Sequence, residues 1–285
     1  MRIEFLGTGG ATTTPRPGCQ CSICVEARAR GVPYSRSGPA IFVHGPDVLI
    51  DTPEEIKDQI NRAGVERINA GIYSHWHPDH TMGRRVWEAL NVDFRNWPPS
   101  GATTDIYLPE QVAADFQHWL GLAEHFEFMT QQGYVQVHEV PDGEQIEIAG
   151  VRITPFRVAE QYVYAFLFED GRNRVLIAPD ELVGWAPPKF IHGVDLAILP
   201  MGLVEHDPLT GERKIQSDHP VLKLEATFAE TLEMARQISA GRTVLTHIEE
   251  QDGYSYDDLL TIQQALNRGG DKIEFAYDTM IVDVG

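Results

Sequence analysis

The sequence predicts an α/β fold in which two β-sheets pack face to face and carry helices on their outer surfaces. Strand-like segments far outnumber segments with helical periodicity along the chain. The stretch 144–178 is nearly all strand and is divided by two hairpin turns, Ala149-Gly150 and Glu169-Asp170-Gly171. A doubly wound sheet alternates strands with helices and does not accommodate such a stretch, so two packed sheets are the better prediction.

Short runs of apolar and β-branched residues between turn signals predict the strands, and amphipathic periodicity predicts the helices. The predicted strands lie near residues 2–6, 40–44, 47–51, 70–73, 104–107, 134–138, 144–148, 151–156, 163–169, 174–178, 195–199, 243–246, 272–276 and 279–284. The predicted helices lie near residues 54–62, 79–90, 109–119, 222–239 and 255–268. The Pro and Gly cluster at 97–101 is predicted to be a loop. The chain has no repeat, low-complexity tract or long linker, so residues 1–285 are predicted to form a single domain.

Acidic residues dominate the charge of the chain, with 42 Asp and Glu against 23 Lys and Arg and a formal net charge of −19. This balance argues against a nucleic-acid partner, which needs clustered basic side chains to displace counterions from phosphates. A small anionic substrate is not excluded, because bound metal cations can reverse the local field. The N-terminus enters a strand-like pattern without a basic leader, and no apolar run approaches the roughly 18 residues of a membrane span. We therefore expect a cytoplasmic protein with no membrane partner.

The segment Ser74-His75-Trp76-His77-Pro78-Asp79-His80 follows the apolar run 68–73 and predicts a metal site at the end of a strand. Imidazole nitrogen and carboxylate oxygen bind Zn, Mn or Fe(II). With only 11 histidines in 285 residues, a chance run of three within six positions is a poor explanation. His75 and His77 can share one metal, while Asp79 and His80 can turn toward a second.

Other metal-capable residues stand at the ends of apolar strands. Asp180 follows the run 175–179, and His247 follows the run 243–246. Parallel neighbouring strands end at one rim, so ligands converge easily from such positions. Asp51 follows Val48-Leu49-Ile50, and we expect it to orient the ligand loop by hydrogen bonds rather than to bind metal.

The three cysteines of the chain, Cys19, Cys21 and Cys24, fall in one short loop. An odd number with C-x-C-x-x-C spacing in a reducing compartment favours thiolates on a structural zinc over disulfides. A closed tetrahedral site then needs a fourth ligand from elsewhere in the chain. The alternative is three free or redox-active thiols.

The pattern His75-x-His77-x-Asp79-His80, with Asp51 upstream and Asp180 and His247 downstream, resembles the metallo-β-lactamase superfamily of hydrolases over essentially the whole chain. Within it, the segments 6–11 and 18–24 are similar to the branch that contains the phosphonate-pathway cyclic phosphodiesterase. The segments 49–53 and 244–248 are also similar to that branch. The histidine motif is specific for the superfamily, and the cysteine loop is specific for the branch but not for a substrate.

The resemblance implies an αββα sandwich with a two-metal site on its rim and a metal-bridging hydroxide as nucleophile. By the family's pattern, Asp180 bridges the metals and Asp79 also steers or accepts the proton of the nucleophile. The expected activity is hydrolysis of a small-molecule ester, with a phosphodiester or cyclic phosphodiester as the leading substrate class. The implied ligands are His75 and His77 for the first metal, and Asp79, His80 and His247 for the second.

Two departures from the family concern the rim. Glu160 stands where relatives usually have a third histidine on the first metal; a carboxylate there favours Mn or Fe(II), and the alternative is a solvated side chain and a weakly bound metal. Glu225 stands where relatives place a substrate-contacting histidine, and an ionised carboxylate there would repel a phosphate. His219 could then act as the general acid, or it could be an ordinary loop histidine.

The third departure concerns the cysteine loop. Its fourth ligand in the phosphodiesterase is a histidine three residues after the last metal histidine, and Glu250 holds that position here. Carboxylate-completed zinc is less common, and Asp252 or another histidine is the alternative ligand.

Two other functions remain open from the sequence. One is ribonuclease Z-like RNA processing, because that group shares the Gly-Thr-Gly-Gly start found at 7–10. The other is a non-catalytic metal or cofactor-binding protein on the same scaffold, because three family histidines are replaced by glutamates. The sequence leaves the oligomeric state open, and the resemblance is compatible with a homodimer.

Overall fold

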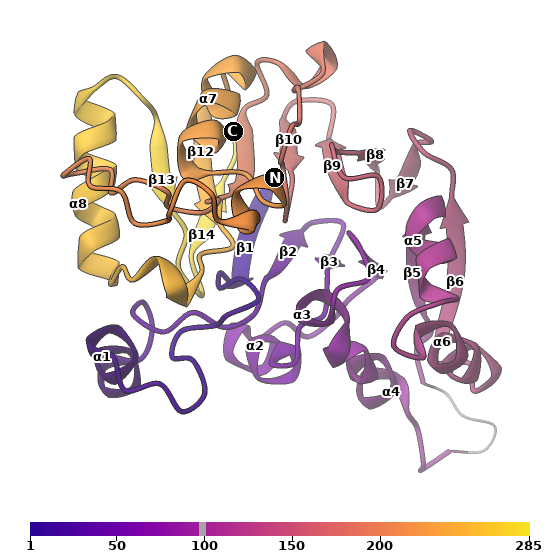
Figure 1. Cartoon of the computed structure of the whole chain (residues 1–285). Coiled ribbons are helices and arrows are strands. Elements are labelled where there is room, and N and C mark those ends of the chain that lie inside the picture. The colour runs from indigo at the N-terminus through magenta and orange to yellow at the C-terminus, as the bar shows by residue number, and fades with distance from the viewer. Residues whose placement is uncertain (97–100) are drawn as a thin grey trace.

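Two mixed sheets of seven strands each form the centre of the molecule, with helices on their outer sides (Figure 1). The structure is a computed structural model and describes residues 1–96 and 101–285. In spatial order, the first sheet contains β14 (Ile281–Asp283), β1 (Arg2–Gly7), β2 (Ala40–His44), β3 (Val48–Ile50), β4 (Ala70–Ile72), β5 (Thr104–Pro109) and β6 (Val135–Val140). The second contains β13 (Ile273–Phe275), β12 (Arg242–Thr246), β11 (Leu196–Pro200), β10 (Arg174–Ile177), β9 (Tyr164–Glu169), β8 (Val151–Arg157) and β7 (Ile146–Ile148). The predicted fold class is confirmed, and each predicted strand is present to within two residues at either end.

The apolar character of the central strands follows from burial on both faces. In β9, Tyr164, Phe166 and Phe168 point into the core between the two sheets, whereas Ala165 and Leu167 point into a second core under the outer helices. Buried side chains of β1 to β5 complete the inter-sheet core from the opposite side. A strand that is covered on both faces has a continuous run of apolar residues, and the sequence of β9 shows such a run.

The helices differ more from the prediction than the strands do. The predicted helix at 79–90 is divided into three short pieces, and the helix predicted from 222 begins only at Phe228, where Thr227 and Glu230 form a capping box. The α-helices are α1 (Ser22–Arg30), α2 (Ile56–Ala63), α3 (Pro78–Thr81), α4 (Val86–Asn91), α5 (Glu110–Phe116), α6 (Leu122–Gln131), α7 (Phe228–Ile238) and α8 (Tyr256–Arg268). The 3-10 helices are η1 (Met82–Arg85), η2 (Lys189–Ile191), η3 (Pro220–Lys223) and η4 (Glu250–Asp252). The loop predicted at 97–101 falls mainly on residues 97–100, outside the described residues.

Two helices, α1 and α6, were not predicted. Only Cys24 and Ala27 of α1 are buried, so this helix has no apolar stripe that periodicity could reveal. In α6, by contrast, Leu122, Phe126 and Met129 are buried at helical spacing, and this signal was present in the sequence.

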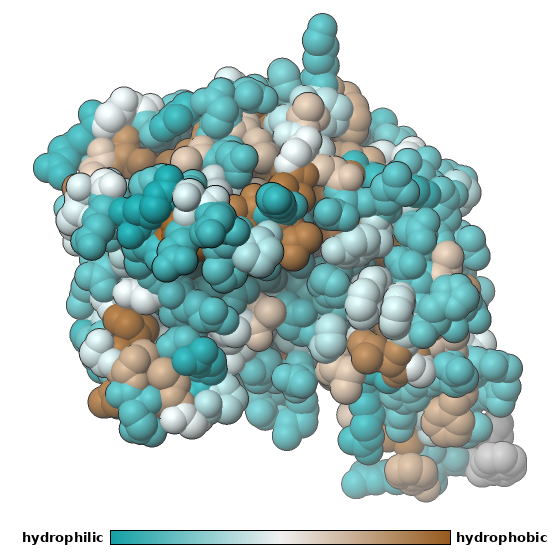
Figure 2. All heavy atoms as spheres, viewed as in Figure 1, coloured by the Kyte–Doolittle hydropathy of each residue, from teal (hydrophilic) through white to brown (hydrophobic). Residues whose placement is uncertain are grey.

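The surface of the molecule agrees with its acidic composition. The face shown in Figure 2 is mostly hydrophilic, and its apolar residues lie in separate patches. Within residues 1–96 and 101–285, no helix is both long enough and apolar enough to cross a bilayer.

Close packing behind the histidine loop depends on Gly71 in β4. A Cβ atom at this position would lie 2.6 Å from Cζ2 of Trp87 and 3.0 Å from Cδ1 of Ile106. The buried Trp87 donates from Nε1 to the hydroxyl of Tyr73 at 2.8 Å, and that hydroxyl is also 2.8 Å from Oγ1 of Thr52. Gly71 therefore leaves room for the indole that holds Tyr73 directly before the histidine loop.

We expect the substitution Gly71→Ala to lower the free energy of unfolding by about 1–3 kcal/mol, because the added methyl group overpacks a rigid core. Urea denaturation monitored by fluorescence measures the change. The exposed Glu66→Ala is the control and should stay within about 0.5 kcal/mol of the parent. Equal stability of the two variants would contradict this account of the packing.

Candidate metal centre and active site

Side chains from three separate strand ends meet at one rim of the sandwich. The loop after β4 carries the histidine motif, the residue three positions after β10 is Asp180, and the residue directly after β12 is His247. Their metal-binding atoms form two groups, and within each group these atoms lie within 4.8 Å of one another. The first group is His75, His77 and Asp180, and the second is Asp79, His80 and His247.

Asp180, a member of the first group, also faces the second group. Its Oδ2 is 3.1 Å from Nε2 of His75 and 3.5 Å from Nε2 of His80. Its Oδ1 is 3.5 Å from Nε2 of His247, and Oδ2 of Asp79 is 3.6 Å from the same nitrogen. This is the position that a bridging carboxylate requires.

The donor atoms of both groups suit divalent cations. Nε2 of His75, His80 and His247 is buried and has no hydrogen-bond partner among the described residues. Buried polar atoms are normally hydrogen-bonded, so three nitrogens that face carboxylates without a hydrogen bond, all directed at one small volume, indicate a ligand. Burial, followed by the neighbouring His75, lowers the pKa of His77 to about 4, which leaves a neutral imidazole able to bind metal.

Asp51 fixes the orientation of the histidine loop from behind. Its Oδ2 is 2.7 Å from Nδ1 of His80 and accepts a hydrogen bond from Oγ of Ser74 at 2.6 Å. Its Oδ1 accepts from the backbone amide of Ser74 at 2.8 Å. Nε2 of His80 therefore points toward the two groups, and Asp51 has the hydrogen-bonding position that the sequence predicted.

Backbone strain accompanies this arrangement. Asp51 has a φ of 62° and His247 a φ of 53°, so both are non-glycine residues in the left-handed region. Such conformations persist only where the surroundings impose them, and they are concentrated at functional sites.

We expect Asp51→Asn to weaken metal binding at the rim by about 10–100-fold, because the amide cannot hold His80 as the carboxylate does. Titration with a competing chelator measures the affinity without any need for a substrate. The control is Asp58→Asn on α2, where the side chain is 77% exposed. Unchanged affinity in Asp51→Asn would refute the orienting role.

The acids and histidines of the centre shift each other's protonation. Burial alone would raise the pKa of Asp180, but the nearby His247 and His75 outweigh it and hold that pKa well below its usual range. Asp79 is affected in the same way, with His80 as the largest favourable partner. Burial lowers the pKa of His247, but the opposing effect of Asp180 and Asp79 is larger and raises this pKa to about 9. The carboxylates are therefore ionised and ready to act as ligands.

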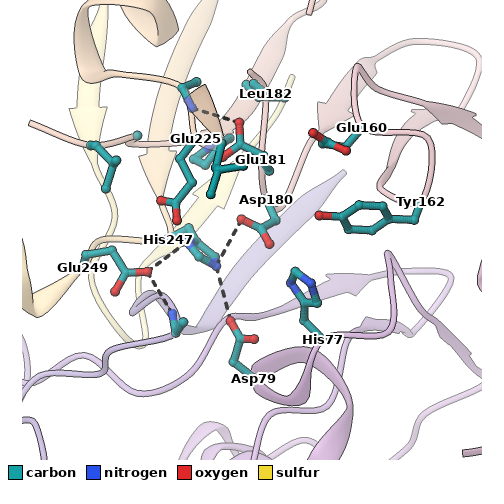
Figure 3. A pocket seen from close by; sticks show the side chains of 16 residues that line it. His77, Asp79, Glu160, Tyr162, Asp180, Glu181, Leu182, Glu225, His247 and Glu249 are labelled. Carbon is teal, nitrogen blue, oxygen red and sulfur yellow. Dashed lines mark hydrogen bonds and ion pairs between the residues drawn. The ribbon is translucent and has the colours of Figure 1, made fainter. Parts of the chain in front are cut away.

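The rim opens into a cavity of about 400 Å³, which is the size of a small-molecule site (Figure 3). Its apolar part includes Leu182, Leu203 and Leu224. Six carboxylates line it, and no Lys or Arg is among its lining residues in the described part of the chain. These acids are Asp79, Glu160, Asp180, Glu181, Glu225 and Glu249.

Glu181, Glu249 and Tyr162 line the cavity but were not predicted from the sequence. Burial, opposed by two backbone hydrogen bonds and helped by Asp180, raises the pKa of Glu181 to about 7. Burial and then Glu160 raise the pKa of Tyr162 to about 12. Glu249 accepts hydrogen bonds from the backbone amides of Ala11 at 2.9 Å and Thr12 at 2.8 Å, so it anchors the N-terminal loop beside His247.

The structure places the three remaining residues predicted near the rim differently. Glu160 lines the cavity but belongs to neither group of clustered ligand atoms, so its metal bond stays a prediction. Glu225 also lines the cavity, and burial followed by Glu249 raises its pKa. His219 is exposed at the start of η3, where its Nδ1 accepts from the amide of Val221 at 3.2 Å, and it does not line the cavity. Its position does not support the predicted general-acid role.

The cysteine loop forms a second, separate cluster. Oε1 of Glu250 lies 3.5 Å from Sγ of Cys19, 3.2 Å from Sγ of Cys21 and 3.0 Å from Sγ of Cys24. Oε2 of the same carboxylate is 3.3 Å from Nε of Arg16. The four side chains together offer the three sulfurs and one oxygen of a closed tetrahedral site.

The thiols of this cluster differ in their surroundings. The backbone amide of Cys21 lowers the pKa of Cys19, whereas burial followed by Glu250 raises the pKa of Cys24 to about 12. Asp252, the alternative fourth ligand, instead accepts from the amide of Val204 at 3.1 Å and is not part of the cluster.

Comparison with known families gives one match over most of the chain. The model of the beta-lactamase superfamily domain matches residues 45–248. That range contains both groups at the rim and excludes the cysteine loop.

Curated relatives match with low identity and uneven coverage. An octanoyltransferase from Porphyromonas gingivalis is 32% identical over 84 residues, which is 29% of this chain and 17% of that protein. Ribonuclease Z from Archaeoglobus fulgidus is 25% identical over 182 residues, which is 61% of this chain but only 50% of that protein. Ribonuclease Z from Myxococcus xanthus is 22% identical over 100% of this chain and 98% of that protein. This chain therefore spans half or less of the length of the first two relatives.

Solved structures resemble the whole chain. A diphosphatase of the PhnP family has a TM-score of 0.70 and 24% identity, covering 100% of this chain and 98% of that one. Zn(2+)-bound PqqB from Methylobacterium extorquens has a TM-score of 0.71 and 18% identity, covering 100% of both chains. At these identities the likeness concerns the fold.

Proposed function

This chain belongs to the metallo-β-lactamase superfamily, and from that premise we propose that it is a metal-dependent hydrolase of a small ester. A phosphodiester or cyclic phosphodiester is the substrate class we favour. The observation that carries the proposal is the meeting of two donor groups from three strand ends on the floor of a cavity that fits a small molecule. The likeness of the fold to a PhnP-family diphosphatase supports the same choice.

In this proposal the two groups each hold one divalent cation, with Zn, Mn and Fe as candidates and Asp180 shared between them. When bound, the cations would supply Lewis acidity and a water of lowered pKa. Oδ2 of Asp79, which faces His80 and His247, would be placed to steer the attacking water or to accept its proton. Asp51 keeps His80 in place through the reaction, and the apolar residues of the cavity limit the access of bulk water.

We further propose that Cys19, Cys21, Cys24 and Glu250 hold a structural zinc. Their four donor atoms lie together although Glu250 is more than 200 residues from the cysteines. This zinc would connect the N-terminal loop to the segment after His247. Glu249 of that segment already binds the same loop on the side of the cavity.

The experiment that tests the proposed hydrolysis combines elemental analysis of the purified protein with a substrate panel. Phosphodiesters, thioesters and lactones are assayed with added Mn, Fe or Zn. The proposal expects metal-dependent turnover of at least one phosphodiester and its loss after chelation. Turnover of only a thioester or a lactone would support a hydrolase but exclude the phosphodiester class. Absence of turnover in protein with both metal sites filled would favour a binding protein.

Ribonuclease Z-like activity is a second candidate because a ribonuclease Z matches this chain over its whole length. The net charge of −19 and a cavity without basic side chains count against an RNA substrate. Incubation with a precursor tRNA in low salt decides between them. Cleavage at the 3′ trailer would establish the ribonuclease, and absence of both binding and cleavage would exclude it.

A further inference from the structure

The wall of the cavity carries more negative charge than a metal site needs. Asp79 and Asp180 belong to the two ligand groups, but Glu160, Glu181, Glu225 and Glu249 line the same cavity outside them. Figure 3 shows these acids reaching the cavity from different segments of the chain, with Glu160 on the side of Tyr162 and Glu225 on the side of His247.

The charge of this wall can be compared with the charge of the metals. Two bound dications would bring four positive charges, whereas the cavity is lined by six carboxylates and by no Lys or Arg of the described residues. The carboxylates outside the two ligand groups thus keep the walls of the cavity acidic even with both metals in place. The ester group of an anionic substrate would be attracted to the two cations on the floor of the cavity. Any further negative charge on the same substrate would be repelled by the carboxylates of the walls.

The cavity is a ligand site on grounds that do not depend on the acids. His247 lines it and its side chain is nine-tenths buried, and Nε2 of this histidine has no hydrogen-bond partner among the described residues. The walls also include the ring of Tyr162 and the side chains of Leu182, Leu203 and Leu224. An aromatic ring beside carboxylates, with aliphatic surface around them, is the environment that binds an alkylammonium group.

We propose that this cavity selects esters that carry a cationic group, with a quaternary or primary ammonium a few bonds from the scissile ester. The inference rests on the proposed hydrolase function and names its substrate class as a zwitterionic phosphodiester. The phosphate binds over the two ligand groups on the floor. The ammonium lies against the acidic wall, with Glu225 and Glu160 on its two sides and the ring of Tyr162 beside it.

Glu225 and Glu160 are the two glutamates of the wall that define this preference. Neither is held by a hydrogen bond among the described residues that would use up its charge, whereas Glu181 accepts from the amides of Ala226 and Val183, and Glu249 accepts from those of Ala11 and Thr12. Glu225 and Glu160 are therefore the carboxylates most free to meet a cation.

A binding experiment tests the preference without any need for turnover. Choline and its neutral isostere 3,3-dimethylbutan-1-ol are titrated into the metal-loaded protein and followed by ligand-observed NMR. We expect choline to bind at least about tenfold more tightly, because the two differ in charge and hardly in shape. The preference should shrink at high salt and in Glu225→Gln and Glu160→Gln, and it should persist in the exposed control Glu66→Gln. Equal binding of the two compounds, or binding of neither, would overturn the proposal.

A matched pair of substrates separates this inference from the proposed function. 4-Nitrophenyl phosphocholine and the corresponding 3,3-dimethylbutyl ester differ only in the charged group. A kcat/KM at least about tenfold higher for the choline ester supports cation selection. Equal cleavage of both would reject the selection and keep the hydrolase. Cleavage of neither, with choline still preferred in binding, would keep the cation site and reject phosphodiester hydrolysis.

Discussion

Replacing Asp180 with alanine is expected to lower kcat/KM on any substrate of this protein by more than about 10³-fold. The reason is that this single carboxylate faces three histidines of the centre, with Oδ2 directed at His75 and His80 and Oδ1 directed at His247. In the proposed site its loss would remove a ligand from both metals at once. Steady-state kinetics and metal analysis of the same preparation measure the effect.

The matched control for this variant is Asp218→Ala, an exposed aspartate in the loop before η3. We expect the control to keep full activity and metal content, and both proteins to retain the circular dichroism spectrum of the parent. Full activity in Asp180→Ala would remove the proposed bridging role. If Asp180→Ala does not fold, Asp180→Asn provides the test, because the amide keeps the shape of the side chain. We expect Asp180→Asn to lose activity as well.

Replacing Cys24 with alanine is expected to remove one bound zinc per chain and to lower the free energy of unfolding by more than about 3 kcal/mol. Metal-binding energy at a structural site is part of the folding energy, so its loss is among the largest effects of a single substitution. Cys24 is buried, and its sulfur lies 3.0 Å from Oε1 of Glu250. Metal analysis and chemical denaturation give the two quantities.

The neighbouring Ser22→Ala serves as the control because Ser22 begins the same helix, is exposed and offers no donor to the cluster. Glu250→Gln extends the test to the unusual fourth ligand and should also weaken the zinc. A parent protein that purifies without zinc, and whose stability does not change in Cys24→Ala, would leave three free thiols as the better explanation.

Much of the centre could be predicted because its residues stand at the ends of apolar strands. Asp51, Asp180 and His247 each follow such a run, and parallel strands bring their carboxyl ends to one rim. Central strands such as β9 and β11 were predictable as well, since burial on both faces leaves a continuous apolar signal in the sequence. The superfamily assignment then followed from the histidine motif and is confirmed by the family match.

The walls of the cavity could not be predicted in the same way. Tyr162 lies in the connection between β8 and β9, and Glu225 lies in the long segment that precedes α7, where chain direction depends on tertiary contacts rather than on periodicity. The imidazole of His219 suggests a general acid, but this residue caps the start of η3 and is exposed at the surface. The position of Glu181 in the cavity could have been predicted from the sequence, because Glu181 directly follows the predicted ligand Asp180.

The rim itself is tested most directly by anomalous X-ray diffraction from crystals of the metal-loaded protein. We expect two peaks about 3.5–4 Å apart, one beside His75, His77 and Asp180 and the other beside Asp79, His80 and His247. A rim that gives no peak with Zn, Mn or Fe, or that places its metals away from Asp180, would contradict it.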